Sequence, residues 1–271
     1  MNRIHATAVV HPQACLGDDV EIGPFAIVED GVLIGDRCRI GAYSLIATGT
    51  RLGADNHLYP GCILGLPPQD LQWRGTSSVL EIGARNVLRE GVTLHRGSAP
   101  DSATVVGSDN YFMVQSHAGH NCRIGDRVIL ANHVLLAGHV EVGDGAFVGG
   151  GAAMHQFGRI GRLVMVSGLS RLRKDVPPFL MVAEDSRIVG LNVVGLRRAG
   201  WSWDEVRAVR RAVRILYREG NNVSQALARL EPLATASPAV AELARFVRSS
   251  RRGICTRFGR GPARDEPDSA A

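Results

Sequence analysis

Residues 22–41 read IGPFAIVEDGVLIGDRCRIG, with an aliphatic residue at every sixth position. The same period runs from Ile4 to Leu172, where 26 of 29 positions are apolar and glycine follows thirteen of them. A period of six fits neither an amphipathic helix nor a long hairpin strand. It suits a triangular coil with one short strand and one turn on each side. The three positions that break the run are Asp70, Thr76 and Pro100.

In such a coil the aliphatic residue points inward and a small residue permits the corner. Three hexads close one turn, and successive turns stack by backbone hydrogen bonds at about 4.8 Å per layer. The sequence therefore predicts a mainly β fold, a left-handed parallel β-helix built from hexapeptide repeats. The breaks in the period predict loops over 65–79 and 97–104, and loops on a rigid scaffold often hold ligand contacts.

Beyond Leu172 the hexads stop, and we expect 175–178 to end the solenoid. The capping box 202–205 predicts a helix as far as Gly220. A second helix is expected after Ser224 until Pro232, and a third from an N-cap at Ser237 to about Gly253. These patterns predict three segments: a left-handed β-helix domain over 1–186, a small C-terminal α-helical domain over 187–256 and a disordered tail over 257–271.

Composition narrows the function classes. The 271 residues contain no apolar run long enough for a membrane span or a signal peptide, so we expect a soluble cytoplasmic protein. The five cysteines are odd in number and form no C-x-x-C pair, which argues against a disulfide framework and a thiolate zinc site and predicts buried thiols. Residues 187–271 hold 16 Arg and 8 acidic residues, but no aromatic platform or recognition motif supports nucleic-acid binding.

Several histidines gather late in the solenoid. A coil of eighteen residues places His120, Gly138-His139 and His155-Gln156 in one column over three layers. A purely structural role stays open. The column also suits general-base catalysis, in which a neutral imidazole takes a proton from a hydroxyl or amine that attacks an acyl carbonyl, while the Gly138 N–H receives the oxyanion. The histidines that gather in this part of the solenoid are His117, His120, His133, His139 and His155.

Metal binding by three histidines is the second chemistry that such a column permits. A group of β-helix carbonic anhydrases binds zinc in this way, with histidines spaced H-x-x-x-x-H. The stretch His117-Ala118-Gly119-His120 does not match that spacing. We therefore expect no metal.

Short motifs occur here in the order and at the intervals of a known family. They include Gln69-Asp70-Leu71, Ser116-His117-Ala118-Gly119-His120, Leu136-Ala137-Gly138-His139-Val140, His155-Gln156-Phe157 and Gly190-Leu191-Asn192. Over about residues 1–255 the chain thereby resembles the UDP-N-acetylglucosamine acyltransferases of lipid A biosynthesis, the LpxA family. The combination of H-x-G-H, A-G-H and H-Q-F at these intervals is more specific than any one motif.

That resemblance implies transfer of an (R)-3-hydroxyacyl chain from acyl carrier protein to the 3-hydroxyl of UDP-N-acetylglucosamine, the first step of lipid A biosynthesis, by a homotrimer. It implies that His120 is the general base, Gly138 the oxyanion donor and Gly168 part of the acyl-chain pocket, where glycine admits a long chain. No cofactor is implied besides the phosphopantetheine thioester of the carrier, whose acidic surface suits the basic helices. The implied substrate-binding positions are Gln69, Asp70, His117, His139, His155, Gln156, Asn192 and Arg198.

Four positions depart from the family pattern. Asn121 replaces the Asp that usually follows the catalytic His; its carbonyl oxygen can still orient the ring, but without a charge. Gln72 stands where a Lys is usual near the UDP moiety, and Arg74 is a possible substitute. Val194 and Ala199 replace positions that are commonly Glu and Arg.

Two alternatives stay open beside O-acylation. One is an N-acyltransferase acting on a 3-amino UDP-sugar, because an amine needs less help from a base. The other is a divergent trimeric paralogue of low activity that binds a nucleotide sugar. The later N-acyltransferase of the pathway carries an N-terminal uridine-binding domain, whereas the hexads here begin at Ile4. An acetyltransferase dependent on coenzyme A would not explain the combined motifs.

Overall fold

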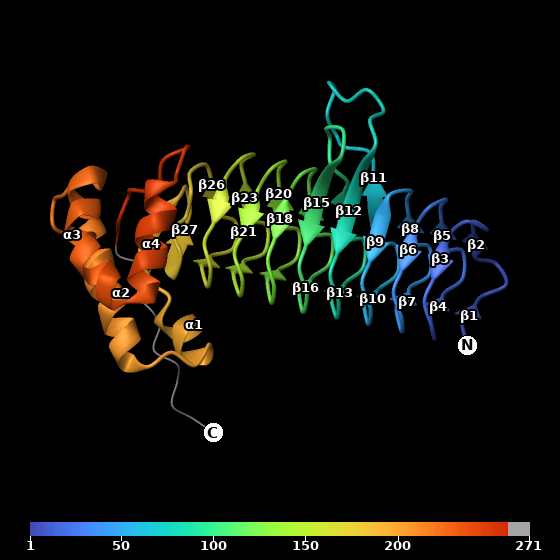
Figure 1. The fold of residues 1–271 in the computed structure, drawn as a ribbon, viewed down its shortest axis with the longest axis horizontal. Helices are drawn as coiled ribbons and strands as arrows, with labels where there is room; N and C mark the ends of the chain where they lie inside the picture. Colours follow the sequence, from blue (N-terminus) through green and yellow to red (C-terminus); the bar gives the residue numbers. More distant parts are fainter. Residues whose placement is uncertain (260–271) are drawn as a thin grey trace.

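The computed structural model describes residues 1–259, a triangular prism of three sheets with helices at one end (Figure 1). The chain visits sheets A, B and C in turn, and from β1 to β27 each strand pairs in parallel with the strand one coil away; β28 then pairs antiparallel with β27. This is the predicted left-handed parallel β-helix.

The strands of the three sheets are short, as a period of six requires. Sheet A contains β1 Arg3–Ile4, β4 Glu21–Ile22, β7 Arg39–Ile40, β10 His57–Leu58, β13 Val87–Leu88, β16 Tyr111–Phe112, β19 Ile129–Leu130, β22 Phe147–Val148, β25 Met165–Val166, β27 Leu180–Ala183 and β28 Arg187–Leu191. Sheet B contains β2 Val9–Val10, β5 Ile27–Val28, β8 Leu45–Ile46, β11 Ile63–Leu66, β14 Thr93–His95, β17 His117–Ala118, β20 Leu135–Leu136, β23 Ala153–Met154 and β26 Arg171–Leu172. Sheet C contains β3 Cys15–Leu16, β6 Leu33–Ile34, β9 Thr50–Leu52, β12 Ser78–Ile82, β15 Ser102–Val106, β18 Arg123–Ile124, β21 Glu141–Val142 and β24 Arg159–Ile160.

The inward hexad residues form the core of the prism. Ile46, Leu64, Ala118 and Leu136, for example, are fully buried on sheet B. Burial of such aliphatic side chains supplies about 1.5–3 kcal/mol each, which stabilises strands that are too short to persist alone. The period of six therefore fixes the inner surface and leaves one outward side chain per strand free for other uses.

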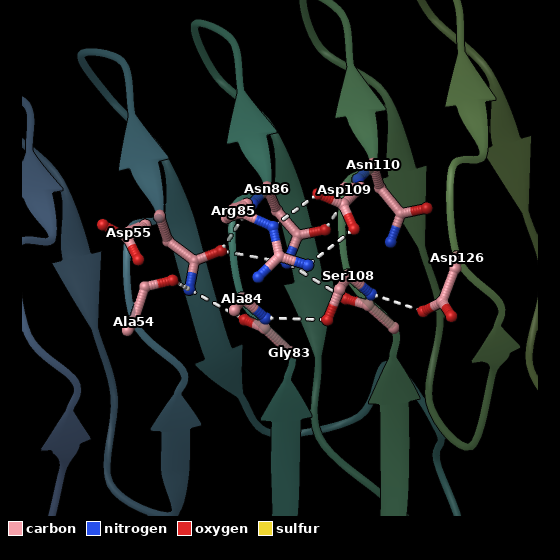
Figure 2. Close-up of polar contacts among 12 residues, drawn as sticks. Ala54, Asp55, Gly83, Ala84, Arg85, Asn86, Ser108, Asp109, Asn110 and Asp126 are labelled. Atoms are coloured by element: carbon pink, nitrogen blue, oxygen red, sulfur yellow. Dashed lines mark hydrogen bonds and ion pairs between the residues drawn. The ribbon is translucent and has the colours of Figure 1, made fainter.

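Polar ladders run along the corner between sheets C and A. Asn86 N–H donates to Asn56 Oδ1 at 2.9 Å, and Asn110 N–H donates to Asn86 Oδ1 at 3.0 Å. Outside the amides, Arg85 forms a bidentate pair with Asp109 (Figure 2). These ladders cross the coils that carry the inserted loops, and so hold the stack in register there.

Two loops leave the prism side by side, over 67–77 and 96–101 (Figure 1). Asp101 N–H donates to the Ser77 carbonyl at 3.0 Å, which joins the two. Both loops are shorter than predicted. The first is not 65–79, because Leu66 of β11 still pairs with His95 and β12 already begins at Ser78. The second ends early because Ser102 already pairs with Ser78 and begins β15. The prediction that 97–104 is all loop was wrong at its end: the long strand β12 offers a partner beyond the hexad.

The helical region follows the prism. The N-cap Ser202 forms the predicted capping box with Glu205, but the helix ends at Tyr217 and does not reach Gly220. The third predicted helix begins as expected after Ser237, but ends before Gly253. The expected second helix was wrong at both ends: Asn222 caps it in place of Ser224, and it continues through Pro232. The helices are α1 Val193–Arg198, which was not predicted, α2 Trp203–Tyr217, α3 Val223–Ala236 and α4 Pro238–Arg248.

The helices dock on the last coils through a buried carboxylate and a partly exposed ion pair. Asp175 is 1% exposed and accepts hydrogen bonds from Arg159 Nε at 3.0 Å and Ser250 Oγ at 2.7 Å. Arg162 pairs with Glu242 of α4 at 2.8 Å. The expected end of the solenoid at 175–178 is a corner, after which β27 still pairs with β25. The expected stop was therefore too early.

The boundary that we propose between 186 and 187 falls in the turn between β27 and β28. Of the expected tail, 257–259 lie against β28, where Phe258 bridges Ile188, and 260–271 lie outside the described residues. Four cysteines are buried as predicted, whereas Cys15 is exposed. Within 1–259, none of the helices has the length and apolarity needed to cross a membrane.

Candidate active site

His120 lies at the corner between sheets B and C, directly after β17. Its Nδ1 is 3.0 Å from Asn121 Oδ1, and its ring lies over Gly138 in the next layer. A Cβ on residue 138 would be only 2.6 Å from His120 Nε2. Glycine at 138 therefore makes room for the imidazole.

Asn121 is held from several directions. It occupies the left-handed region with φ of 60°, which Asn adopts more readily than most residues. Its N–H donates to Thr104 Oγ1 at 2.7 Å. Its Oδ1 accepts from the Ser98 N–H at 3.0 Å and from Ser98 Oγ at 2.9 Å. The side chain that contacts the His120 ring is thus fixed by the 96–101 loop.

His139 continues the column by one layer. Its N–H donates to the His120 carbonyl at 2.8 Å, and the two rings meet edge to face at 5.1 Å. The His139 ring also stacks on Phe157, with the ring centres 4.5 Å apart. Burial and the neighbouring His120 lower the pKa of His139, against an opposing pull from Asp70. His139 is therefore held towards its neutral form beside the 67–77 loop.

His117 lies on the outward side of sheet B, just before the corner. Its Nδ1 is 2.8 Å from Thr93 Oγ1, and its ring meets His95 edge to face at 5.4 Å. Burial, with a smaller contribution from His95, lowers the pKa of His117 to about 4. His95 Nδ1 donates in turn to the Pro67 carbonyl at 2.6 Å, which ties the 67–77 loop to this cluster.

The remaining predicted residues of this corner are open to solvent. His155 and Gln156 lie one layer beyond His139 and are exposed, as is Gln69 in the projecting loop. Phe157 N–H donates to the Gly138 carbonyl at 3.1 Å, which confirms the stacking of these layers. The predicted three-layer column is therefore present, with a surface that a ligand can reach.

Other predicted residues lie elsewhere on the same chain. Gly168 follows β25 at the corner between sheets A and B, and so does His133 after β19. Asn192 caps α1, accepting from the Gly195 N–H at 3.0 Å, and its Nδ2 donates to the Leu163 carbonyl at the C–A corner. Arg198 is exposed in the last turn of α1. One chain does not bring these residues to His120.

Ser98 and Thr104 were not singled out from the sequence. The only available signal was their place in the loop expected over 97–104. Within residues 1–259, no three His, Cys, Asp or Glu side chains are grouped so that they could hold a metal ion. The N–H of Gly138 donates to no atom of this same part of the chain. The corner therefore offers a ring nitrogen and a nearby free backbone donor, the two parts that acyl transfer needs.

Known proteins share both the sequence and the fold. A family model described as "Udp N-acetylglucosamine O-acyltransferase; Domain 2" matches residues 175–255, and one described as "Bacterial transferase hexapeptide (six repeats)" matches 16–48. An acyl-[acyl-carrier-protein]–UDP-N-acetylglucosamine O-acyltransferase of Paraburkholderia phymatum is 45% identical over 260 residues, which cover 94% of this chain and 99% of that relative.

Two solved structures show the same likeness in three dimensions. LpxA from Bacteroides fragilis 9343, a UDP-N-acetylglucosamine acyltransferase, has a TM-score of 0.90 at 39% identity, over 93% of this chain and 99% of that one. LpxA from Acinetobacter baumannii has a TM-score of 0.88 at 35% identity, over 94% of this chain and 99% of that one.

Proposed function

Because the chain belongs to the acyl-[acyl-carrier-protein]–UDP-N-acetylglucosamine O-acyltransferase family, we propose that the corner around His120 and Gly138 is its active site. The protein is an acyltransferase of lipid A biosynthesis. Its reaction moves an acyl chain, in our proposal an (R)-3-hydroxyacyl chain, from acyl carrier protein to the 3-hydroxyl of UDP-N-acetylglucosamine.

The proposed chemistry uses two groups in turn. His120 Nε2 takes the proton of the sugar 3-hydroxyl, whose oxygen attacks the thioester carbonyl carbon. The Gly138 N–H donates to the oxyanion that develops on that carbonyl. When the tetrahedral intermediate collapses, the carbon–sulfur bond breaks and the leaving thiolate takes the proton from His120. An ester and a free phosphopantetheine thiol result, and the ring returns to its neutral form.

One observation carries this assignment. The His120 ring is bound at Nδ1 by Asn121 Oδ1 and lies against Gly138, whose N–H donates to no atom of residues 1–259. A base and an oxyanion donor therefore stand in adjacent layers. A ring that served packing alone would not need this cleared space.

Neighbouring groups suit a polar sugar nucleotide. We assign substrate contacts to the neutral rings of His117 and His139, and to Asp70, which lies close enough to influence His139. A neutral ring can accept or donate a hydrogen bond without competing with His120 for the proton. The further contacts that we propose are Gln69, His155, Gln156, Asn192 and Arg198.

We further propose a homotrimer, because sheet B and the later strands of sheet A, from β13 to β25, carry mainly apolar outward side chains, although β1, β4 and β7 of sheet A carry Arg3, Glu21 and Arg39. Sheet C differs, since its outward column contains Arg51, Glu81, Arg123 and Glu141. If the apolar faces of neighbouring prisms meet, Gly168, Asn192 and Arg198 of one chain can approach His120 of another. The apolar outward residues include Ile129, Phe147 and Met165 on sheet A, and Ile27, Ile63 and Leu135 on sheet B.

The helices are the proposed docking surface for the acyl donor. Arg210 and Arg211 of α2 are exposed and make no ion pair with any of residues 1–259. An acidic carrier protein would be attracted and oriented by them. Its phosphopantetheine thioester is the only prosthetic group that the reaction requires, and we place this reaction in the cytoplasm.

Product identification tests the proposed function. Purified protein is incubated with a panel of 3-hydroxyacyl carrier proteins and with UDP-N-acetylglucosamine or its 3-amino analogue, and products are read by mass spectrometry. We expect an O-acyl product from the hydroxyl acceptor. Product from the amine alone would instead support the N-acyltransferase alternative, and binding without any product would support the low-activity paralogue.

A further inference from the structure

The orientation of the Asn121 amide is decided by the loop over 96–101. A backbone N–H can only donate, so the atom that faces the Ser98 N–H at 3.0 Å must be the oxygen of the carboxamide. The same oxygen is 3.0 Å from His120 Nδ1. His120 Nδ1 must then carry a hydrogen, and Nε2 keeps its lone pair on the side of Gly138.

A flipped amide would have the opposite effect. It would turn the NH₂ group of Asn121 towards His120 Nδ1 and favour the tautomer that carries its hydrogen on Nε2, which cannot accept a proton from the substrate. The flip would also oppose that NH₂ group to the Ser98 N–H, two donors facing each other. A carboxylate at 121 would not have this weakness, since both of its oxygens accept.

We propose that Ser98 is a positioning residue of this enzyme: its N–H and hydroxyl fix the Asn121 amide, and through it the tautomer of His120 that acts as the base. The hydroxyl supplies the second donor to Asn121 Oδ1, at 2.9 Å. Ser98 thereby gives a neutral residue the orienting part of the role that an Asp plays elsewhere in the family.

The surroundings of Ser98 are built to hold it in place. Thr76 Oγ1 donates to the Ser98 carbonyl at 3.2 Å. Ser102 Oγ accepts from the Ala99 N–H at 3.0 Å and donates to the Ala99 carbonyl at 2.7 Å, which closes the loop. The Thr104 hydroxyl fixes the backbone of Asn121 by accepting a hydrogen bond from its N–H. Both partners of the Ser98–Asn121 contact are thus anchored independently of the substrate.

A double-mutant cycle tests this role, with kcat and KM measured separately. Ser98→Ala removes the hydroxyl, one of the two donors that Ser98 supplies to Asn121 Oδ1, and should lower kcat roughly three- to tenfold and leave KM unchanged. In the Asn121→Ala background the same change should have no further effect, within about twofold. Ser98→Thr should restore most of the rate, because it restores the hydroxyl.

Ser108→Ala is the matched control, since Ser108 Oγ also accepts from a backbone N–H, that of Ala84 at 3.0 Å, but at another corner (Figure 2). It should leave kcat unchanged. The role of Ser98 would be overturned if Ser98→Ala lowered kcat equally in the unmutated enzyme and in Asn121→Ala. It would also be overturned if Ser98→Ala left the kcat of the unmutated enzyme unchanged.

Because this role follows from the proposed function of His120, a second measurement separates the two. Imidazole ¹⁵N resonances of His120, identified by their absence in His120→Ala, report the tautomer whether or not the protein turns over. We expect the Nδ1-protonated ring in the unmutated protein and a larger share of the Nε2-protonated ring in Ser98→Ala. The same tautomer mixture in both proteins would contradict the inference. If acyl transfer is absent but the tautomer responds to Ser98, only the proposed function fails.

Discussion

The imidazole of His120 occupies the space that a side chain on Gly138 would fill: a Cβ there would lie 2.6 Å from Nε2 and 2.7 Å from Cε1. The obstacle is the end of a flexible side chain and not a piece of backbone. A side chain at 138 can therefore be accommodated if the His120 ring moves, and that movement displaces the base.

Gly138→Ala should accordingly damage catalysis more than stability. Displacing a reacting group by about 1 Å can cost on the order of 100-fold in rate, whereas the prism has only to let one ring rotate. We expect kcat to fall by roughly 10- to 100-fold with a small change in melting temperature. Steady-state kinetics and a thermal melt on the same preparation measure both. A large loss of stability with unchanged kcat in the folded fraction would show that Gly138 serves packing alone.

Stability should depend on pH through His117. Burial lowers the pKa of His117 from its ordinary 6.5 to about 4, so between these values the unfolded chain binds the proton more readily than the folded chain. The pH-dependent part of the folding stability that comes from His117 is fully present above about pH 6.5 and is lost as the pH falls towards 4. For one titrating group the free energy of unfolding can change by at most about 1.4 kcal/mol per pH unit. The change from His117 should be smaller, because water screens the exposed part of its ring.

The measurement is the melting temperature between pH 4 and 8 for the unmutated protein and His117→Gln. The variant, which cannot titrate at this position, should lose less stability on acidification. Parallel curves for the two proteins would contradict the assignment.

Asp175 should be critical for docking the helices. It is 1% exposed and neutralises Arg159, so Asp175→Asn leaves a largely buried guanidinium without its counter-charge. Breaking such a pair from one side costs about 3–5 kcal/mol. Denaturant unfolding measures the loss. The control is Asp55→Asn, which breaks the exposed pair with Arg37 and should matter little because water screens that pair. Equal effects from the two changes would refute the anchoring role of Asp175.

Chain length should respond to the size of residue 168. A Cβ on Gly168 would lie 3.2 Å from the Gly150 carbonyl oxygen, so a longer side chain would extend outward from the corner. If this surface lines the acyl pocket, Gly168→Met should shift the preferred donor to a shorter chain by several carbons. Competition among acyl carrier proteins of different length measures the shift. An unchanged preference would place the acyl chain elsewhere.

The core of the prism could be predicted from the sequence because each hexad sets its own inward residue. Ile46 and Leu136 are buried at positions that counting by six identifies. The interruptions at Asp70 and Pro100 likewise predicted both loops. The start of β15 at Ser102 could not be predicted, because it depends on a partner strand that extends past its own hexad.

The stacking of the candidate site residues could be predicted from the sequence, but the hydrogen bonds that hold them in place could not. His120 and Gly138 are eighteen residues apart, which is one coil, so the period alone stacks them. Ser98 and Asn121 meet across an inserted loop, whose path no repeat encodes. Gly168 lies 48 residues after His120, which is eight sides of the prism. Because three sides make one coil, eight sides end at a different corner.

The most direct test of the central claim is the turnover of His120→Ala beside the unmutated enzyme, with UDP-N-acetylglucosamine and a saturating acyl carrier protein. Loss of a general base should lower kcat by about 100- to 10,000-fold while KM changes little. His11→Ala, which removes an exposed histidine far along the prism, should keep full activity. A His120→Ala enzyme that retains kcat within about threefold would show that the base lies elsewhere and would contradict the proposed mechanism.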